Sequence, residues 1–399
     1  MTSPTGLVVT LCTALVLTMT GFMPVAAVLP AIFADWQLTE AQAGWLNGVY
    51  FGAYAAGVPF LLPLTDRTDP RRVLLFAFAL SAAGGLGFAF LADGLWSGMF
   101  FRVLAGIGLA GVHFPALKLI ADRLTGTAQQ RGSAVYISMF SVGGALSFVS
   151  AGAIEAVLPW KWVFTVSGAA AVSAFLLTLI FVSADRSPIV RTKSALLDFR
   201  PVLRNAAAMR YVVAYFGHVW EVFAMRGWSV ALLVFSAAQA GNQAFAGWNM
   251  AILSGVASLM MMPTSVGVAE LSRRYGPVPV ITGATVVTVA LVVVLAAAKT
   301  GPFLMVVLLI AIYLMAGFGD TATLASGIVE AAASQYRGAT LAVYALTGFA
   351  GGMAGPVTFG AVLDWTGGRD DPNAWSWAFA SLAIGAVITA AALHLRRRR

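Results

Sequence analysis

The chain alternates between long apolar runs and short polar segments. Residues 1–34 hold no Lys, Arg, Asp or Glu, and residues 278–298 are mostly Val, Ala, Leu, Ile and Thr. A run of about 20 apolar residues crosses the roughly 30 Å hydrocarbon core of a bilayer as a helix. Breaking the chain at its polar segments predicts twelve such helices, over residues 8–33, 42–64, 73–92, 96–118, 132–155, 161–183, 209–236, 244–268, 278–298, 302–327, 339–362 and 374–394.

The apolar runs favour helices over strands. An open sheet would leave backbone groups unpaired in lipid, and the alternating ten-residue segments of a membrane barrel are absent from the sequence. The first run exceeds the roughly 7–15 apolar residues of a secretory signal, so we expect it to be retained. The sequence therefore predicts an all-α polytopic membrane protein.

Composition supports this fold class. Of the 399 residues, 60% are hydrophobic and 10% are charged, and the mean hydropathy is +0.86. Because about a quarter of the residues in a soluble domain are charged, most of this chain cannot face water. Cys12 is the single cysteine, which excludes a disulfide framework and a cysteine-based metal site.

The basic residues indicate which side of the membrane each loop occupies. If the N-terminus is cytoplasmic, the inner loops and the C-terminal tail hold 19 of the 24 Lys and Arg residues, and the outer loops hold Lys161, Lys299 and Arg369. The positive-inside rule then predicts that both termini are cytoplasmic, in an inner (plasma) membrane of bacterial type. Topology also explains the net charge of +8, so no nucleic-acid partner is predicted.

Polar and aromatic landmarks recur about 200 residues apart. Ala-Gly-Trp occurs at 43–45 and 246–248, Arg-Gly at 131–132 and 337–338, and paired tryptophans at 160–162 and 375–377. Six spans return the chain to the same side of the membrane, so the halves are expected to be parallel repeats. The predicted domains are two six-helix bundles, residues 1–184 and 207–399, joined by a cytoplasmic linker at 185–206.

The loop after the second span carries a motif. Residues 62–72 read Leu-Pro-Leu-Thr-Asp-Arg-Thr-Asp-Pro-Arg-Arg, and residues 267–274 carry a degenerate copy. The acid and the three arginines are similar to the hallmark loop of the major facilitator superfamily, which the chain resembles over nearly its whole length. The resemblance implies a central cavity between the halves that opens to each side in turn. It also implies that a set of loop residues gates this motion, namely Asp66, Arg67, Arg71, Arg72, Glu270, Arg273 and Arg274. The alternative is that these residues only set topology.

Few ionisable side chains fall inside the predicted spans. Such a group costs about 2.5–3.5 kcal/mol or more within the bilayer, so it needs a partner or a function. The candidates for a substrate and proton pathway are Arg102, His113, His218, Glu221, Arg226 and Asp320.

The seventh span is the richest in these groups. His218 and Glu221 are three residues apart and share a helical face, so Glu221 could exchange a proton beside the imidazole. The alternative is a structural hydrogen bond from His218 to Glu221. Arg226 lies off that face and could bind an anionic substrate or pair with either acid. Asp320, after two glycines, could carry a proton or contact substrate, and a structural ion pair is its alternative.

The fourth span holds the remaining two candidates. Arg102 with Gly106 and Gly108 is similar to the Arg-x-x-x-Gly-x-Gly signature of proton-coupled drug antiporters, whereas their Gly-Pro signature in the fifth span is missing. His113 is expected to pack or to line the cavity. Residues 260–262 are three methionines, which leaves metal transport as a less favoured reading because methionine commonly fills gaps in cores.

Together these features predict a monomeric secondary active transporter that moves a small organic solute, with proton coupling, and that needs no cofactor or resident metal. The Arg102 signature slightly favours efflux. The alternative is uptake of a small organic anion such as a carboxylate, with Arg102 and Arg226 as counter-charges, and a non-transporting receptor is less favoured. An enzyme is not expected, because no His-Glu-x-x-His, Gly-x-Ser-x-Gly or phosphate-loop motif is present.

Overall fold

The structure is a computed structural model that describes residues 3–65, 67–184 and 199–394. These residues form helices and turns and contain no strand. The α-helices are α1 Pro4–Met19, α2 Pro24–Ala27, α3 Leu29–Trp36, α4 Glu40–Leu64, α5 Pro70–Leu91, α6 Leu95–Ala110, α7 His113–Arg123, α8 Gly126–Glu155, α9 Lys161–Phe181, α10 Arg200–Arg204, α11 Ala206–Ala237, α12 Met250–Leu259, α13 Met261–Tyr275, α14 Pro277–Ala298, α15 Phe303–Gly319, α16 Thr321–Ala331, α17 Arg337–Trp365 and α18 Pro372–His394.

The prediction of twelve transmembrane helices is confirmed. Ten helical segments of the described chain are long and apolar enough to cross a membrane. The shorter apolar helix α1 and the 25-residue helix α4 supply the other two. At about 1.5 Å per residue, α4 is longer than the hydrocarbon core is thick. Its Glu40, Asn47, Tyr50 and Tyr54 lower its hydropathy without shortening it.

The first predicted span is not one continuous helix, which corrects the expectation for residues 8–33. α1 ends at Met19, and four non-helical residues separate it from the short helices α2 and α3. Pro24 and Pro30 stand at the first turns of α2 and α3, where proline is tolerated because its missing N–H would have no helical partner. The break leaves backbone carbonyls inside the membrane without partners from within their own helix, so their hydrogen bonds must come from side chains of other helices.

Three more predicted spans consist of two helices each. The fourth span divides between α6 and α7, the eighth between α12 and α13, and the tenth between α15 and α16. The junction of the tenth span is Asp320 itself, which follows Gly319. The eighth span begins later than expected, because Ala246–Trp248 form a turn and Asn249 caps α12 by accepting a hydrogen bond from the amide of Ile252 at 3.0 Å.

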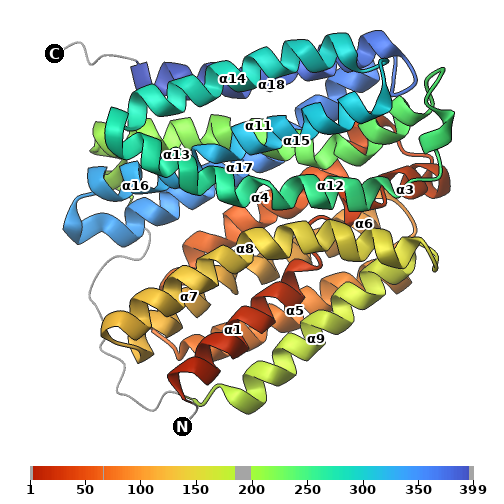
Figure 1. Ribbon diagram of the computed structural model, residues 1–399. Helices are drawn as coiled ribbons and strands as arrows, with labels where there is room; N and C mark the ends of the chain where they lie inside the picture. The colour runs from red at the N-terminus through yellow and green to blue at the C-terminus, as the bar shows by residue number, and fades with distance from the viewer. Residues whose placement is uncertain (1–2, 66, 185–198, 395–399) are drawn as a thin grey trace.

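The helices lie in two groups, which we name the N-terminal half (α1–α9) and the C-terminal half (α10–α18). In Figure 1 the red-to-yellow helices of the first half occupy the lower part of the view, and the green-to-blue helices of the second half occupy the upper part. α4 packs on α17 and α8 packs on α12 across the boundary. The residue limits of the two bundles remain a prediction, because most of the expected linker, residues 185–198, lies outside the described residues.

Glycines bring the backbones of α4 and α17 close together. A methyl group added at Gly44 would lie 2.7 Å from the carbonyl oxygen of Pro356, and one added at Gly48 would lie 2.7 Å from the carbonyl oxygen of Met353. Both distances are far below van der Waals contact, so only glycine fits. Small residues of this kind allow close helix packing in membranes.

A second close contact joins α8 and α12. The side-chain amide of Asn249 donates a 2.8 Å hydrogen bond to the carbonyl of Gly152. A methyl group added at Gly152 would meet the Cβ of Ala251 at 3.0 Å. Asn249 therefore caps its own helix with its oxygen and ties the two halves together with its nitrogen.

The halves are joined at one end of the molecule. Glu40, at the start of α4, accepts hydrogen bonds from the backbone and guanidinium of Arg369 at 3.2 and 3.1 Å, and Asp364 accepts one from the amide of Ala41 at 3.4 Å. Asn47 donates to the carbonyl of Gly227 at 2.9 Å. Among the described residues, hydrogen bonds between the two halves are limited to these and to the one from Asn249 to Gly152. All of them lie in the part of the molecule where α4 and α12 begin.

At the other end of the molecule, α13 packs on α14, α15 and α16 of its own half. Of its 15 residues, Met261 alone is buried. We name the joined end the closed face. In the predicted topology it is the outer face, and the opposite end, toward which α4 and α12 run, faces the cytoplasm.

Candidate functional site

α11 carries three of the six candidate residues. Every residue from Gly217 to Leu233 is buried, because this helix packs on α17, α18 and α15 and also faces α2 and α3 of the other half. His218, Glu221 and Arg226 are 2%, 5% and 5% exposed. The helix therefore places three ionisable groups in the interior of the molecule.

His218 is paired with Asp320 rather than with Glu221. Its Nδ1 lies 2.8 Å from Oδ1 of Asp320, and its Nε2 lies 3.0 Å from the hydroxyl of Thr321. Both partners stand at the junction of α15 and α16, where the tenth span is interrupted. The suggested hydrogen bond from His218 to Glu221 is thus replaced by a contact between two spans.

Glu221 has a weaker set of partners. Its Oε2 accepts a 3.3 Å hydrogen bond from the hydroxyl of Thr288 in α14. That hydroxyl has a single hydrogen, and the carbonyl of Thr285 at 3.0 Å competes for it. Glu221 and Asp320 are the two acids buried within these spans, at 5% and 4% exposure.

The cluster of His218, Glu221 and Asp320 combines two carboxyl groups with one imidazole. A protonated imidazole balances one carboxylate, and a second ionised carboxylate would leave a net negative charge in the apolar interior. An unbalanced buried charge is costly. The cluster therefore has one more acid than base, and a proton held on one of the acids would remove the excess negative charge.

Aromatic residues that the sequence analysis missed enclose this cluster. The ring of Tyr215 stacks on His218 at 5.8 Å between centroids and on Tyr344 of α17 at 3.9 Å. The hydroxyls of Tyr344 and of Tyr54, on α4, are buried without a hydrogen-bond partner. Their spacing in sequence carries no signal, because they meet only through the packing of α4, α11 and α17.

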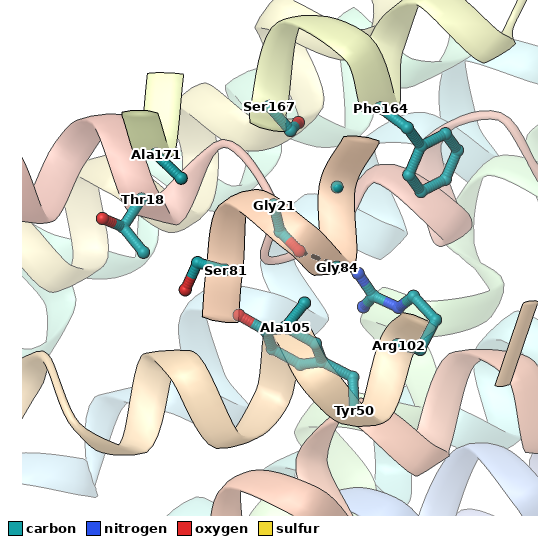
Figure 2. A pocket seen from close by; sticks show the side chains of 11 residues that line it. Thr18, Gly21, Tyr50, Ser81, Gly84, Arg102, Ala105, Phe164, Ser167 and Ala171 are labelled. Carbon is teal, nitrogen blue, oxygen red and sulfur yellow. Dashed lines mark hydrogen bonds between the residues drawn. The ribbon is translucent and has the colours of Figure 1, made fainter. Parts of the chain in front are cut away.

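Arg102 lies inside the N-terminal half and supports the break after α1. Its guanidinium donates hydrogen bonds to the carbonyls of Gly21 and Phe22 at 2.8 and 3.3 Å and stacks over the ring of Tyr50 at 4.1 Å. Figure 2 shows the side chain pointing at Gly21; both residues line a small cavity together with Ser81 and Ser167. The cavity, about 20 Å³ in volume, has room for about one water molecule.

Arg226 differs from Arg102, because its guanidinium makes no hydrogen bond or ion pair with any described residue, and its Nε is buried without a partner. The suggested pairing with Glu221 or Asp320 is therefore not formed. The guanidinium lies 5.7–5.9 Å from the ring centroids of Phe22, Phe148 and Phe223. Phe22 and Phe148 belong to the N-terminal half and Phe223 to α11, so Arg226 lies between the halves.

His113 begins α7 and packs against aromatic rings, as expected. Its ring lies 4.7 Å from Phe140 and 5.8 Å from Tyr136 between centroids. Its Nδ1 is buried without a hydrogen-bond partner. No acid among the described residues pairs with it, so its surroundings are those of a packing residue.

The predicted gating loops differ in their contacts. Asp66 lies outside the described residues. The Asp69 side chain caps α5 by accepting a hydrogen bond from the amide of Arg71 at 2.9 Å, and the Arg71 guanidinium donates to the carbonyl of Leu179 in α9 at 2.7 Å. In the second copy, Arg273 and Glu270 form an ion pair at 2.8 Å within one helix, with side chains 80% and 71% exposed. Such an exposed pair contributes about 0–1 kcal/mol.

The three consecutive methionines, residues 260–262, do not lie in one shared site. Met261 is buried, whereas Met260 and Met262 are 44% and 38% exposed on either side of the junction between α12 and α13. Among the described residues, no three His, Cys, Asp or Glu side chains are grouped to hold a metal ion. The reading as a metal transporter has no support from this region.

Comparison with known families and curated proteins agrees with this architecture. The sequence profile of the Major Facilitator Superfamily matches residues 10–329. The chain is 24% identical to protein spinster homolog 1 of Bos taurus over 223 residues, and this alignment covers 53% of the chain and 42% of the relative. It is 26% identical to multidrug resistance protein MdtG of Enterobacter lignolyticus over 267 residues, and this alignment covers 65% of the chain and 61% of that relative. The match thus spans less than half of the length of the first relative.

Solved structures share the fold. A bacterial homologue of the human lysosomal transporter Spinster, in an inward-facing and occupied conformation, superposes with a TM-score of 0.73 at 16% identity, covering 97% of this chain and 94% of that one. The nucleoside transporter NupG superposes with a TM-score of 0.76 at 14% identity, covering 97% and 99%. At these identities the similarity concerns the fold.

Proposed function

The chain belongs to the Major Facilitator Superfamily, and from this premise we propose that it is a proton-coupled secondary transporter of a small organic solute. The family assignment supports a multi-pass membrane transporter of small solutes rather than an enzyme. Coupling to protons, the direction of transport and the solute are the parts that we propose.

The buried cluster of His218, Glu221 and Asp320 supports proton coupling most directly. Its members come from α11 and from the junction of α15 and α16, and a contact between two spans responds when those spans move. Because the cluster is neutral with one acid protonated, a change in its exposure to water would load or release a proton. Glu221 is the favoured carrier, since a shared threonine hydroxyl is its one hydrogen-bond donor among the described residues.

The test is transport by purified protein in liposomes with and without an imposed pH gradient. Glu221→Gln keeps the size and hydrogen-bonding capacity of the side chain but cannot ionise. The variant should bind solute and exchange it across the membrane, yet should not accumulate it when a pH gradient is applied. A Glu221→Gln protein that concentrates solute as well as the parent does would rule out Glu221 as the carrier.

Asp320→Asn is the matched control, because it removes the other acid of the same cluster. If Asp320 serves to hold His218 in place, this variant should lose thermal stability while the surviving protein still couples transport to the gradient. A loss of accumulation in Asp320→Asn alone would assign the carrier role to Asp320 instead.

Two observations bear on direction. Efflux is supported by the Arg102 signature and by the similarity to a protein named for multidrug resistance. Arg102, however, donates to the carbonyls of the α1–α2 break, which gives it a structural task. Uptake of a small organic anion is the second candidate, and the unpaired guanidinium of Arg226 favours it.

The remaining proposals concern placement in the cell. We propose that the protein is a monomer in a bacterial-type inner (plasma) membrane. The distribution of Lys and Arg between loops supports the further proposal that both termini lie in the cytoplasm. In this topology the closed face is extracytoplasmic, and the hydrogen bonds that join the halves at this face support the proposal of an inward-facing state.

A further inference from the structure

Two buried arginines lie close to the break between α1 and α2, and they are in opposite chemical situations. Arg102 has acceptors in the carbonyls of Gly21 and Phe22 and a ring beneath it in Tyr50. Arg226, 5% exposed, has five N–H donors and no acceptor among the described residues. A buried guanidinium without an acceptor is strongly unfavourable unless something else supplies the missing charge.

We propose that Arg226 is the binding site for the anionic group of the transported solute, which we identify as an aromatic carboxylate. This inference rests on the proposed transport function. A carboxylate fits because the planar guanidinium binds it through two parallel charge-assisted hydrogen bonds. The bound anion would neutralise the positive charge of Arg226, which no described side chain neutralises.

The surroundings of Arg226 specify the rest of the ligand. Phe22 contacts Tyr50, Phe51, Phe140 and Phe223 edge-on at 5.4–6.0 Å between centroids. Aromatic rings of this kind favour edge-to-face packing with another ring. On the α8 side, Gly144 has no side chain, and a methyl group there would lie 3.1 Å from Nη2 of Arg226. The site therefore presents one cation amid aromatic surfaces.

The position of Arg226 suits a substrate that enters from the end opposite the closed face. The next residue in α11, Gly227, accepts the hydrogen bond of Asn47, and the indole of Trp228 donates to the carbonyl of Pro356 at 3.1 Å. The first of these contacts joins the two halves immediately beyond Arg226, and the second lies within the C-terminal half. A ligand bound to Arg226 would touch both halves, since Phe22 and Phe148 come from one and Phe223 from the other.

The first measurement needs no ligand. Arg226→Met keeps the length of the side chain and removes the unbalanced charge, so the unliganded variant should melt at or above the temperature of the parent. Arg102→Met is the matched control and should melt lower, because it leaves two buried carbonyls without donors. Melting of Arg226→Met clearly below the parent would mean that Arg226 has a structural partner and would overturn the proposal.

The second measurement uses phenylacetate as the probe and its neutral analogue phenylacetamide as the control, with detergent-solubilised protein and no proton gradient. Phenylacetate should raise the melting temperature of the parent, phenylacetamide should not, and Arg226→Met should lose the response. Arg226→Lys should retain a reduced response, because it keeps the charge without the planar fork. Absence of a response in the parent, or an equal response in Arg226→Met, refutes the site. Because no gradient is applied, either result leaves the transport test of Glu221 independent.

Discussion

The close contact between α4 and α17 allows a direct test of how the two halves move. In Gly48→Ala, the new methyl group would lie 2.7 Å from the carbonyl oxygen of Met353 and 3.0 Å from a methyl group of Val357. Backbone oxygen cannot swing aside as a flexible side chain would, so the two helices must separate. We expect the substitution to weaken the closed face and to shift the protein toward the state in which that face is open.

The size of the effect follows from packing. Forcing an extra methyl group into a close-packed contact costs about 1–3 kcal/mol, and a bias of that size between two states changes their ratio about 5- to 150-fold. The cost applies only to the closed state, because separated helices accommodate the methyl group. Gly85→Ala is the matched control, since its methyl group would lie 2.7 Å from Gly168 within the N-terminal half and should lower stability in both states alike.

Opening of the closed face can be measured by cysteine labelling at the contact between α8 and α12. Ala251 is buried at the contact between α8 and α12, away from Gly48. In a Cys12→Ser background, Ala251→Cys should react slowly with a thiol reagent, and adding Gly48→Ala should accelerate the reaction by about the factor above. Equal acceleration by Gly85→Ala, or none by Gly48→Ala, would show that the contact between α4 and α17 does not hold the face closed.

Two further predictions concern the closed face and the topology. Glu40→Gln removes the charge that pairs with Arg369 at 3.1 Å. Because Arg369 is 39% exposed, we expect this change to shift the balance between the closed and open states by at most about 1 kcal/mol, measured as the labelling rate of Ala251→Cys. A larger increase in labelling rate than Gly48→Ala produces would contradict this expectation. In intact cells, a cysteine replacing Lys161 should react with an impermeant reagent and one replacing Arg398 should not, and labelling of Arg398→Cys would contradict the cytoplasmic C-terminus.

The sequence predicted the number and approximate limits of the spans because hydropathy is a property of each segment by itself. The breaks within spans were harder to predict. The one after Met19 is supported by Arg102, about 80 residues away, whose guanidinium supplies the donors that the carbonyls of Gly21 and Phe22 need. Pro24 and Pro30 were the local signals for this break, and proline within a predicted span is also compatible with a kinked continuous helix.

Pairing between spans was the other limit. Helical spacing placed Glu221 one turn from His218, which suggested a local pair, whereas the carboxylate that contacts the imidazole is that of Asp320, 102 residues away in sequence. Likewise, the sequence could count Gly44 and Gly48 as small residues but could not show that they face α17 rather than a neighbour in their own half. Contacts of this kind depend on how whole helices are arranged.

The positions of Glu221 and Arg226 on one helix determine how proton and anion binding would influence each other. Five residues of helix separate them, so their charges lie about 10 Å apart, and at an effective dielectric constant near 20 their interaction is about 1–2 kcal/mol. An ionised Glu221 weakens the attraction of Arg226 for an anion, and by reciprocity a bound anion favours the protonated form of Glu221. Binding of a proton would thus favour binding of the anion. Transport of both in the same direction requires this positive coupling, whereas exchange of one for the other requires that each weaken the binding of the other. The Glu221→Gln protein should accordingly bind phenylacetate roughly 5- to 30-fold more tightly than the parent at a pH where Glu221 is ionised; if its affinity is no higher at any pH, the two sites act independently.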